Sequence, residues 1–123
     1  DKSILENVLY ACLNEDECRD AYKEILAYPK IKTLFKNVDL NYENVGYSGE
    51  SLSGGQRQVV NIISGLINPS KILILDEPTN ALDKELKNEI IELIKDFKKR
   101  KQCIIIISHD NDIFKIFDEK VDV

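Results

Sequence analysis

One short turn in the sequence has the residue types that could hold a phosphate. Ser53, Gly54 and Gly55 precede Gln56 and open a predicted helix. Glycine allows the backbone to approach a ligand closely, and the unpaired N–H groups at the start of a helix favour an anion. Simple capping of a buried helix by Ser53 is the alternative interpretation. Gln56 and an acidic pair further along the chain favour the ligand.

That acidic pair, Asp76 and Glu77, follows four apolar residues that predict a buried strand. Successive side chains of a strand point to opposite faces, so the two carboxylates are expected to do different work. One can hold Mg2+ through water, and the other can orient or deprotonate an attacking water. An ordinary acidic turn, helped by Pro78, is the alternative.

A histidine occupies the same place after a second predicted strand. Ser108, His109 and Asp110 follow the apolar residues 103–107. If the two strands are neighbours, His109 should lie beside Asp76 and Glu77, where it could contact a γ-phosphate. A lone histidine that is structural or merely exposed is the alternative.

The elements that must position these residues can be read from helix caps and apolar patterns. Four helices are predicted to begin at residues with a capping side-chain oxygen: Ser3, Asn14, Ser53 and Asp83. Pro29 should end the second of them, and 31–35 predicts a further helical turn. The polar stretch 37–49 is predicted to be a loop, and the Ser53 helix should run to about Leu66, largely buried.

The second half of the chain predicts a parallel sheet. Strands are expected at 71–75 and 103–107, separated by the helix after Asp83, which makes a βαβ unit. The continuous apolar runs predict strands covered on both faces. A short helix at 112–117 and the start of another strand at the C-terminus are also expected.

Composition excludes several other classes of protein. The 123 residues make at most one small domain, and the net charge of -5 argues against sequence-independent nucleic-acid binding. The longest apolar run is too short to span a membrane. The basic run 98–101 is expected to be solvated at a helix end rather than to bind nucleic acid. The three cysteines are expected to be reduced packing residues, and the lack of methionine favours a piece of a longer protein.

Five elements in one order resemble those of the ABC ATPase family. They are the signature motif (Leu52–Gln56), the Walker B strand (Ile72–Glu77), the D-loop (Asn80–Asp83), the switch histidine (His109) and an exporter-type X-loop (Val45, Gly46 and Gly49). Ser3–Val8 also resembles the stretch after the Q-loop of exporters. Ser64, Gly65 and Tyr47 depart from the exporter pattern, and no Walker A sequence Gly-x-x-x-x-Gly-Lys occurs in the chain.

The resemblance implies a role for each matched residue. Asp76 would be the magnesium-associated aspartate, Glu77 and His109 would act on ATP, and Asp83 would communicate across a dimer of ATPase domains. Ser53, Gly54, Gly55 and Gln56 would contact the ATP held mainly by a partner domain. ATP and Mg2+ are therefore the implied cofactors.

The resemblance also implies the architecture and the partners. It covers the second half of a family domain: a helical subdomain (1–68), followed by the C-terminal part of an α/β lobe with a P-loop NTPase-like parallel sheet (69–123). The implied partners are a second ATPase domain and transmembrane domains, at the cytoplasmic face of a membrane, with no nucleic acid.

Two other functions are consistent with the sequence. The sequence Asp-Glu-Pro-Thr-Asn at 76–80 is closer to that of non-exporter members, so a soluble ABC protein acting on ribosomes or DNA is one alternative. A non-catalytic fragment that binds partners is the other, with a docking surface drawn from these residues: Tyr10, Tyr22, Tyr28, Leu34 and Phe35. We expect most of these five to be core.

Overall fold

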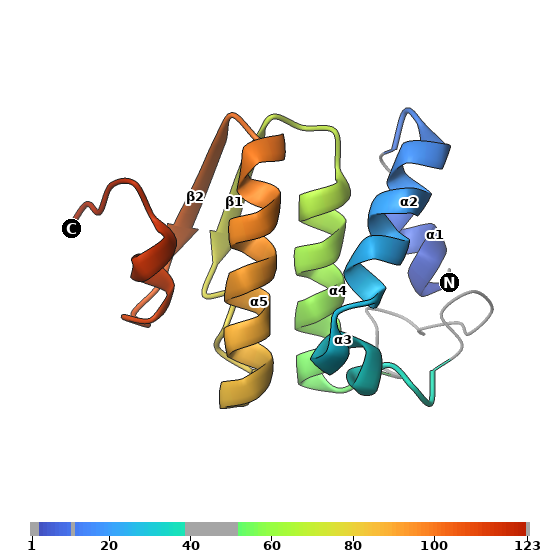
Figure 1. Cartoon of the computed structure of the whole chain (residues 1–123), viewed down its shortest axis with the longest axis horizontal. Helices are drawn as coiled ribbons and strands as arrows, with labels where there is room; N and C mark the ends of the chain where they lie inside the picture. The colour runs from blue at the N-terminus through green and yellow to red at the C-terminus, as the bar shows by residue number, and fades with distance from the viewer. Residues whose placement is uncertain (1–2, 11, 39–51, 123) are drawn as a thin grey trace.

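The computed structural model describes residues 3–10, 12–38 and 52–122, so the predicted X-loop at 45–49 lies outside the described residues. The elements are the helices α1 (Ile4–Leu9), α2 (Glu15–Leu26), α3 (Pro29–Leu34) and α4 (Gly54–Ile67), strand β1 (Ile72–Asp76), helix α5 (Lys84–Phe97), the 3-10 helix η2 (Lys98–Arg100), strand β2 (Cys103–Ile107) and the 3-10 helix η3 (Ile113–Ile116). Figure 1 shows α4 between α5 and the strands on one side and α1 and α2 on the other.

The predicted caps are confirmed at all four helix starts. The side chains of Ser3, Asn14, Ser53 and Asp83 each accept a hydrogen bond from the backbone N–H three residues later. Ser3 and Ser53 form full capping boxes. Pro29 differs from its prediction, because α2 already ends at Leu26 and the proline begins α3, where its missing N–H costs nothing.

The two strands form a parallel sheet joined by α5, as the βαβ pattern predicts. Their register pairs Ile72 with Cys103 and Asp76 with Ile107, so both strands end at the same level. The residues that follow the strands, Glu77 and Ser108, therefore start side by side at one edge of the sheet.

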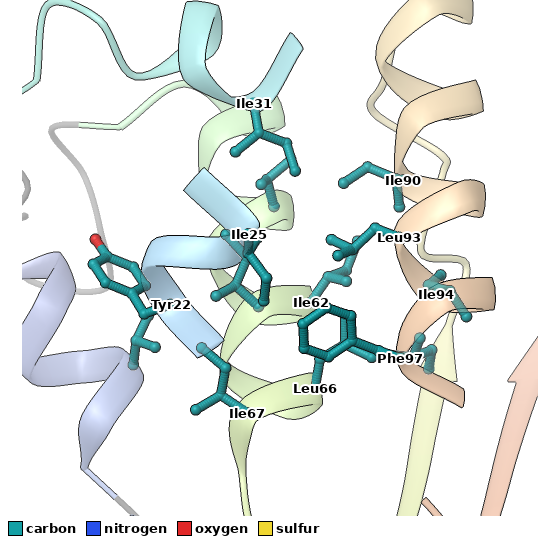
Figure 2. Packing of buried hydrophobic residues seen from close by; sticks show 14 of the residues in the cluster. Tyr22, Ile25, Ile31, Ile62, Leu66, Ile67, Ile90, Leu93, Ile94 and Phe97 are labelled. Carbon is teal, nitrogen blue, oxygen red and sulfur yellow. The ribbon is translucent and has the colours of Figure 1, made fainter. Parts of the chain in front are cut away.

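A single hydrophobic core joins the helical half to the sheet half (Figure 2). Ile25 of α2, Ile62 of α4, and Leu93 and Phe97 of α5 are each at most 2% exposed. Polar contacts add to this junction: the Tyr28 hydroxyl donates to Asp96, and the Ile31 N–H donates to Glu89 at 2.8 Å. The start of α3 is thereby fixed on α5.

The prediction that both faces of the sheet are covered is wrong for the described residues. Leu73 and Leu75 are buried on the helix side, whereas Ile72 and Ile74 are 57% and 62% exposed. In β2, Ile105 and Ile107 are also about half exposed. Burial depends on what covers a strand, and none of the described elements lies over this face.

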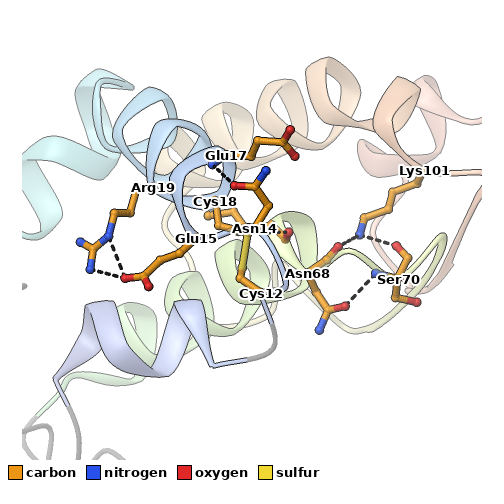
Figure 3. Close-up of a disulfide and its surroundings, with 10 residues drawn as sticks. Cys12, Asn14, Glu15, Glu17, Cys18, Arg19, Asn68, Ser70 and Lys101 are labelled. Atoms are coloured by element: carbon orange, nitrogen blue, oxygen red, sulfur yellow. Dashed lines mark hydrogen bonds and ion pairs between the residues drawn. A yellow bond between two sulfur atoms is a disulfide. The ribbon is translucent and has the colours of Figure 1, made fainter.

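The expectation of three reduced packing cysteines is also wrong. Cys12 and Cys18 form a disulfide, which Figure 3 shows between the turn after α1 and the first part of α2. The two cysteines are six residues apart in the sequence, and their Cα atoms lie 6.4 Å apart. Cys103 is free and exposed rather than packed.

The basic run at the end of α5 makes tertiary contacts rather than being simply solvated. Lys98 donates to the Ile116 carbonyl at 3.2 Å, and Arg100 pairs with Glu24 at 2.9 Å. The Lys101 ammonium donates to the carbonyls of Asn68 and Ser70, and burial lowers its pKa (Figure 3). These cations bind the fold itself.

Two smaller expectations can also be compared with the structure. The helix predicted near 112–117 is present as η3, but residues 118–122 form no strand. Of the aromatic residues considered as a docking surface, Tyr22 and Phe35 are buried, and Tyr10 is 78% exposed. The prediction that most of these residues belong to the core is therefore confirmed for Tyr22 and Phe35.

Candidate functional site

The glycine turn before α4 keeps its polar side chains bonded within the fold. The Ser53 hydroxyl accepts from the Gln56 N–H at 3.1 Å, and the Ser53 N–H donates to Gln56 Oε1 at 2.9 Å. The Gln56 amide also donates to the Leu34 carbonyl at 3.1 Å. Among the described residues, the backbone N–H groups of Gly54 and Gly55 have no acceptor. Backbone, more than side chain, is what this turn offers to an anion.

The two glycines have different surroundings. Apart from its own helix turn, a Cβ on Gly54 would meet no heavy atom of the described residues within 4 Å, so this position is open to a ligand. A Cβ on Gly55 would lie 3.5 Å from the Ala81 carbonyl and 3.9 Å from the Leu82 side chain. Gly55 therefore brings the start of α4 close to the turn that follows β1.

Asp76 and Glu77 point into different hollows, in agreement with the predicted alternation. Asp76 lines a groove between α4 and β1, together with Gly54 and Arg57. Glu77 lines a second hollow, together with Lys84 and His109. The two carboxylates are thus adjacent in sequence, but one lines the groove beside α4 and the other lines the hollow that contains His109.

The backbone of Glu77 is in an unusual conformation. Its φ is 46°, in the left-handed region, and it is the one non-glycine residue with positive φ among the described residues. Its N–H still donates to the Ile107 carbonyl at 2.8 Å, which extends the sheet pairing by one residue. Strain of this kind is commonest at functional sites.

His109 lies beside Glu77, as its place after β2 predicts. Its Nε2 is 3.7 Å from Glu77 Oε1, and its side chain is 99% exposed. An imidazole with this freedom can turn toward a ligand in the hollow without disturbing the core. Asp83 borders the same turn, and one of its oxygens caps α5 by accepting from the Leu86 N–H at 2.9 Å.

Sequence reasoning missed the polar network beneath His109. Lys87 of α5 pairs with Asp110 and Asp112, each at 3.1 Å, and the buried Thr79 donates to Asp110 at 3.2 Å. The hydrogen bond from the Asp112 N–H lowers the pKa of Asp110 most, and the bonds from Lys87 and Thr79 lower it further. The hydrogen bonds that Lys87 makes to Asp112 and Asp110 raise the pKa of Lys87. The network fixes the loop after β2 to α5.

A second missed residue is Gln58 of α4. Its Nε2 donates to the Glu77 carbonyl at 2.6 Å, and its Oε1 accepts from the Ala81 N–H at 2.9 Å. The only available signal was a polar residue on a helix that is otherwise largely apolar. Partners about twenty residues away along the chain leave no periodic trace in the sequence.

The acidic residues fit a magnesium ion that takes most of its ligands from outside the protein. Mg2+ is usually held by one or two carboxylates together with waters and substrate phosphates. In the part of the chain that the structure describes, the Asp76 carboxylate has no hydrogen-bond or ion-pair partner, and no cluster of three or more metal-binding side chains occurs. Asp76 could hold such an ion, whereas a closed cage of protein ligands is not present there.

Comparisons with known proteins agree with this fold. The family model described as ABC transporter matches residues 2–80. The chain belongs to the ABC transporter family, and it corresponds to part of an ATP-binding domain. It is 38% identical over 121 residues to the spermidine/putrescine import ATP-binding protein PotA of Clostridium novyi, which covers 97% of this chain and 33% of PotA.

Other relatives include proteins named for export. The chain is 39% identical over 74 residues to the macrolide export ATP-binding/permease protein MacB of Marinobacter nauticus, covering 60% of this chain and 12% of MacB. A solved structure of a bacterial Atm1-family ABC exporter with ATP bound has a TM-score of 0.70 and 25% identity, and covers 92% of this chain and 19% of that one. This likeness shows a P-loop NTPase-like α/β fold.

The chain is short beside these relatives. It spans 33% of the length of PotA and 12% of the length of MacB. Within the described residues, no helix is both long and apolar enough to cross a bilayer.

Proposed function

We propose that this chain is the C-terminal half of an ATP-hydrolysing domain that powers the export of a substrate across a membrane. The observation that carries the proposal is the meeting of Glu77 and His109, 3.7 Å apart, where β1 and β2 end together, with Asp76 one residue away. Family membership supports ATP as the ligand. Export is favoured by the X-loop resemblance, although the relatives include importers as well as exporters.

Each acidic residue has a separate role in this proposal. Asp76 holds Mg2+ through its free carboxylate, and the ion supplies neutralisation of phosphate charge when it is bound. Glu77 orients the attacking water or takes its proton, because its carboxylate opens into the hollow that it shares with His109. His109, exposed and unhindered, contacts the γ-phosphate.

The start of α4 acts on a different ATP molecule. Ser53, Gly54, Gly55 and Gln56 present the open end of the helix to the ATP of a second ATPase domain, and Asp83 lies near the same turn to sense that domain. Gly54 supports this role because it faces open space. The N–H groups of Gly54 and Gly55 are the donors offered there.

The proposed organisation places the helical subdomain at 1–68 and the C-terminal part of the catalytic lobe at 69–123. The partners are a second ATPase domain and transmembrane domains, which hold the protein at the cytoplasmic face of a membrane. The lysine-bearing phosphate cradle comes from residues outside this sequence, since the sequence has no Walker A motif. The exposed apolar face of β1 and β2 is consistent with a further element that packs there.

The proposal is tested by Glu77→Gln in the full polypeptide. We expect ATP hydrolysis to fall by about a hundredfold or more, because the amide cannot accept a proton from water. Glu92→Gln, on the exposed side of α5, is the matched control and should leave the rate unchanged. Equal rates for the wild type and Glu77→Gln would contradict the role of Glu77.

The isolated chain provides the second arm of the same experiment. It should show no hydrolysis above background, since most of the binding and catalysis depends on the absent lysine-bearing cradle. Turnover by the isolated chain that is abolished by Glu77→Gln would show that the cradle is not required.

A further inference from the structure

The side chain of Gln58 joins helix α4 to both ends of the turn that follows β1. It donates to the Glu77 carbonyl at 2.6 Å and accepts from the Ala81 N–H at 2.9 Å. The donor and acceptor of one primary amide are therefore both used, and the amide fits only in this orientation. Gln58 therefore connects the first residue of the turn, Glu77, to Ala81 near the end of the turn.

Glu77 is the residue that most needs such a contact. With φ at 46°, its backbone is in a region that side chains with a Cβ seldom adopt, and such a conformation persists only where the surroundings determine it. Among the described residues, three hydrogen bonds hold the Glu77 backbone: its N–H donates to Ile107, and its carbonyl accepts from Asn80 at 3.3 Å and from Gln58. The Gln58 bond is the shortest of the three and the one made by a side chain.

We propose that Gln58 is a positioning residue for the hydrolysis assigned to Glu77. By fixing the Glu77 carbonyl and the Ala81 N–H to α4, it aims the Glu77 carboxylate into the hollow shared with His109. The inference rests on the proposed function, because it concerns the same reaction. Gln58 itself lines the groove on the Asp76 side, so it acts through the backbone of Glu77 and not by touching the water or the γ-phosphate.

The same contact relates the two ends of the site. Gln58 is four residues after Gly54, on the helix whose start is proposed to face the ATP of a partner domain. Gly55 already lies close to the Ala81 carbonyl. The position of Glu77 is therefore set relative to the start of α4 and not by its own strand alone.

The test compares Gln58→Leu with Gln102→Leu in the full polypeptide. Leucine keeps much of the side-chain volume and removes both hydrogen bonds, while Gln102 is exposed at the other end of the sheet. We expect Gln58→Leu to lower kcat by about tenfold to a hundredfold with KM changed by less than about twofold, because a misplaced group loses rate more than binding. Gln102→Leu should match the wild type.

Gln58→Glu provides a second variant that does not depend on the leucine protein folding. Its carboxylate can still accept from the Ala81 N–H but cannot donate to the Glu77 carbonyl, so it should also lower kcat. Amide hydrogen exchange of the peptide that contains Ala81 should be faster than in the wild type for Gln58→Leu and close to the wild type for Gln58→Glu. A structural role alone would not lower kcat in the variant that keeps the Ala81 bond.

A double mutant separates this inference from the proposed function. In a Glu77→Gln background, Gln58→Leu should cause no further loss of residual hydrolysis, because Gln58 acts through Glu77. Wild-type kcat in both Gln58 variants would overturn the inference, as would a full additional loss in the Glu77→Gln background. No effect of Glu77→Gln would overturn the proposed function itself.

Discussion

The start of α4 and the turn after β1 are neighbours in space, but they use their polar groups in opposite ways. At the start of α4, Ser53 and Gln56 bond to each other, and Gln56 also bonds to Leu34, which leaves the N–H groups of Gly54 and Gly55 without an acceptor among the described residues. At the turn after β1, the backbone is held by Gln58, while the carboxylate of Glu77 faces the exposed His109 and that of Asp76 has no bonded partner among the described residues.

The difference shows how one chain can offer both an anion site and acidic groups at close range. Side chains build the shape of the first region, and the helix end supplies partial positive charge. In the second region, the side chains of Asp76 and Glu77 supply the negative charge, while Gln58 of α4 holds the backbone in place. Removing a capping side chain in the first region should therefore cost stability, and removing a carboxylate in the second should chiefly affect the chemistry.

The largest expected effect is a loss of ATP hydrolysis on substitution of a carboxylate at the end of β1. Asp76→Asn in the full polypeptide should lower Mg2+-dependent ATP hydrolysis by about a hundredfold, because the neutral amide is a poor magnesium ligand. The free energy of unfolding should change by less than about 0.5 kcal/mol, since Asp76 is exposed and its carboxylate has no hydrogen-bond or ion-pair partner among the described residues. Steady-state kinetics and urea denaturation measure the two quantities.

The control for Asp76→Asn is Asp20→Asn, the same change at an exposed position of α2. It should alter neither quantity. A loss of stability in Asp76→Asn without a loss of hydrolysis would remove the contrast between the two regions.

A moderate effect on the free energy of unfolding is expected at the start of α4. Ser53→Ala removes the oxygen that accepts from the Gln56 N–H, so it should lower the free energy of unfolding by about 1 kcal/mol. Ser64→Ala, on the same helix, removes no cap and should be neutral or slightly stabilising by about 0.5 kcal/mol. Equal urea midpoints for the two variants would show that the capping box contributes no stability.

The smallest effect concerns the network under His109, and it depends on pH. The pKa of Asp110 is lowered in the folded state, chiefly by the Asp112 N–H and then by Lys87 and Thr79. The stability that it contributes is present above the ordinary aspartate pKa of 3.8 and is lost as the pH falls through the lowered folded value. The wild type should therefore melt above Asp110→Asn at neutral pH, with the gap closing in acid.

Thermal melts of the wild type and Asp110→Asn between neutral and strongly acidic pH measure this closing gap. Asp20→Asn should run parallel to the wild type over the same range. A gap that is constant with pH would mean that the charge of Asp110 does not contribute through this network.

Most of what the sequence predicts correctly is local. A capping oxygen and the N–H it accepts from are three residues apart, so Ser3, Asn14, Ser53 and Asp83 could be recognised without knowledge of the fold. The parallel pairing of β1 and β2 followed from one βαβ pattern, and it placed His109 beside Glu77. The order of the motifs was sufficient to predict the family.

Most of the failures concern contacts between distant parts of the chain, whereas the missed Cys12–Cys18 pair is only six residues apart. The exposure of Ile72 and Ile74 depends on which elements cover the sheet, and an apolar strand has the same composition whether it is covered or not. Gln58, Lys87 and the Cys12–Cys18 pair act through partners that only the folded geometry selects. Neither apolar periodicity nor spacing encodes such choices.

The two-stranded sheet also determines how the chain should behave when it is produced alone. In the described residues each strand pairs with the other along one edge only, and β2 is five apolar residues with Ile105 and Ile107 about half exposed. An open apolar edge of this kind pairs readily with copies of itself. The isolated chain should therefore self-associate as its concentration rises, and co-expression with a segment that covers the sheet is the direct way to keep it in solution.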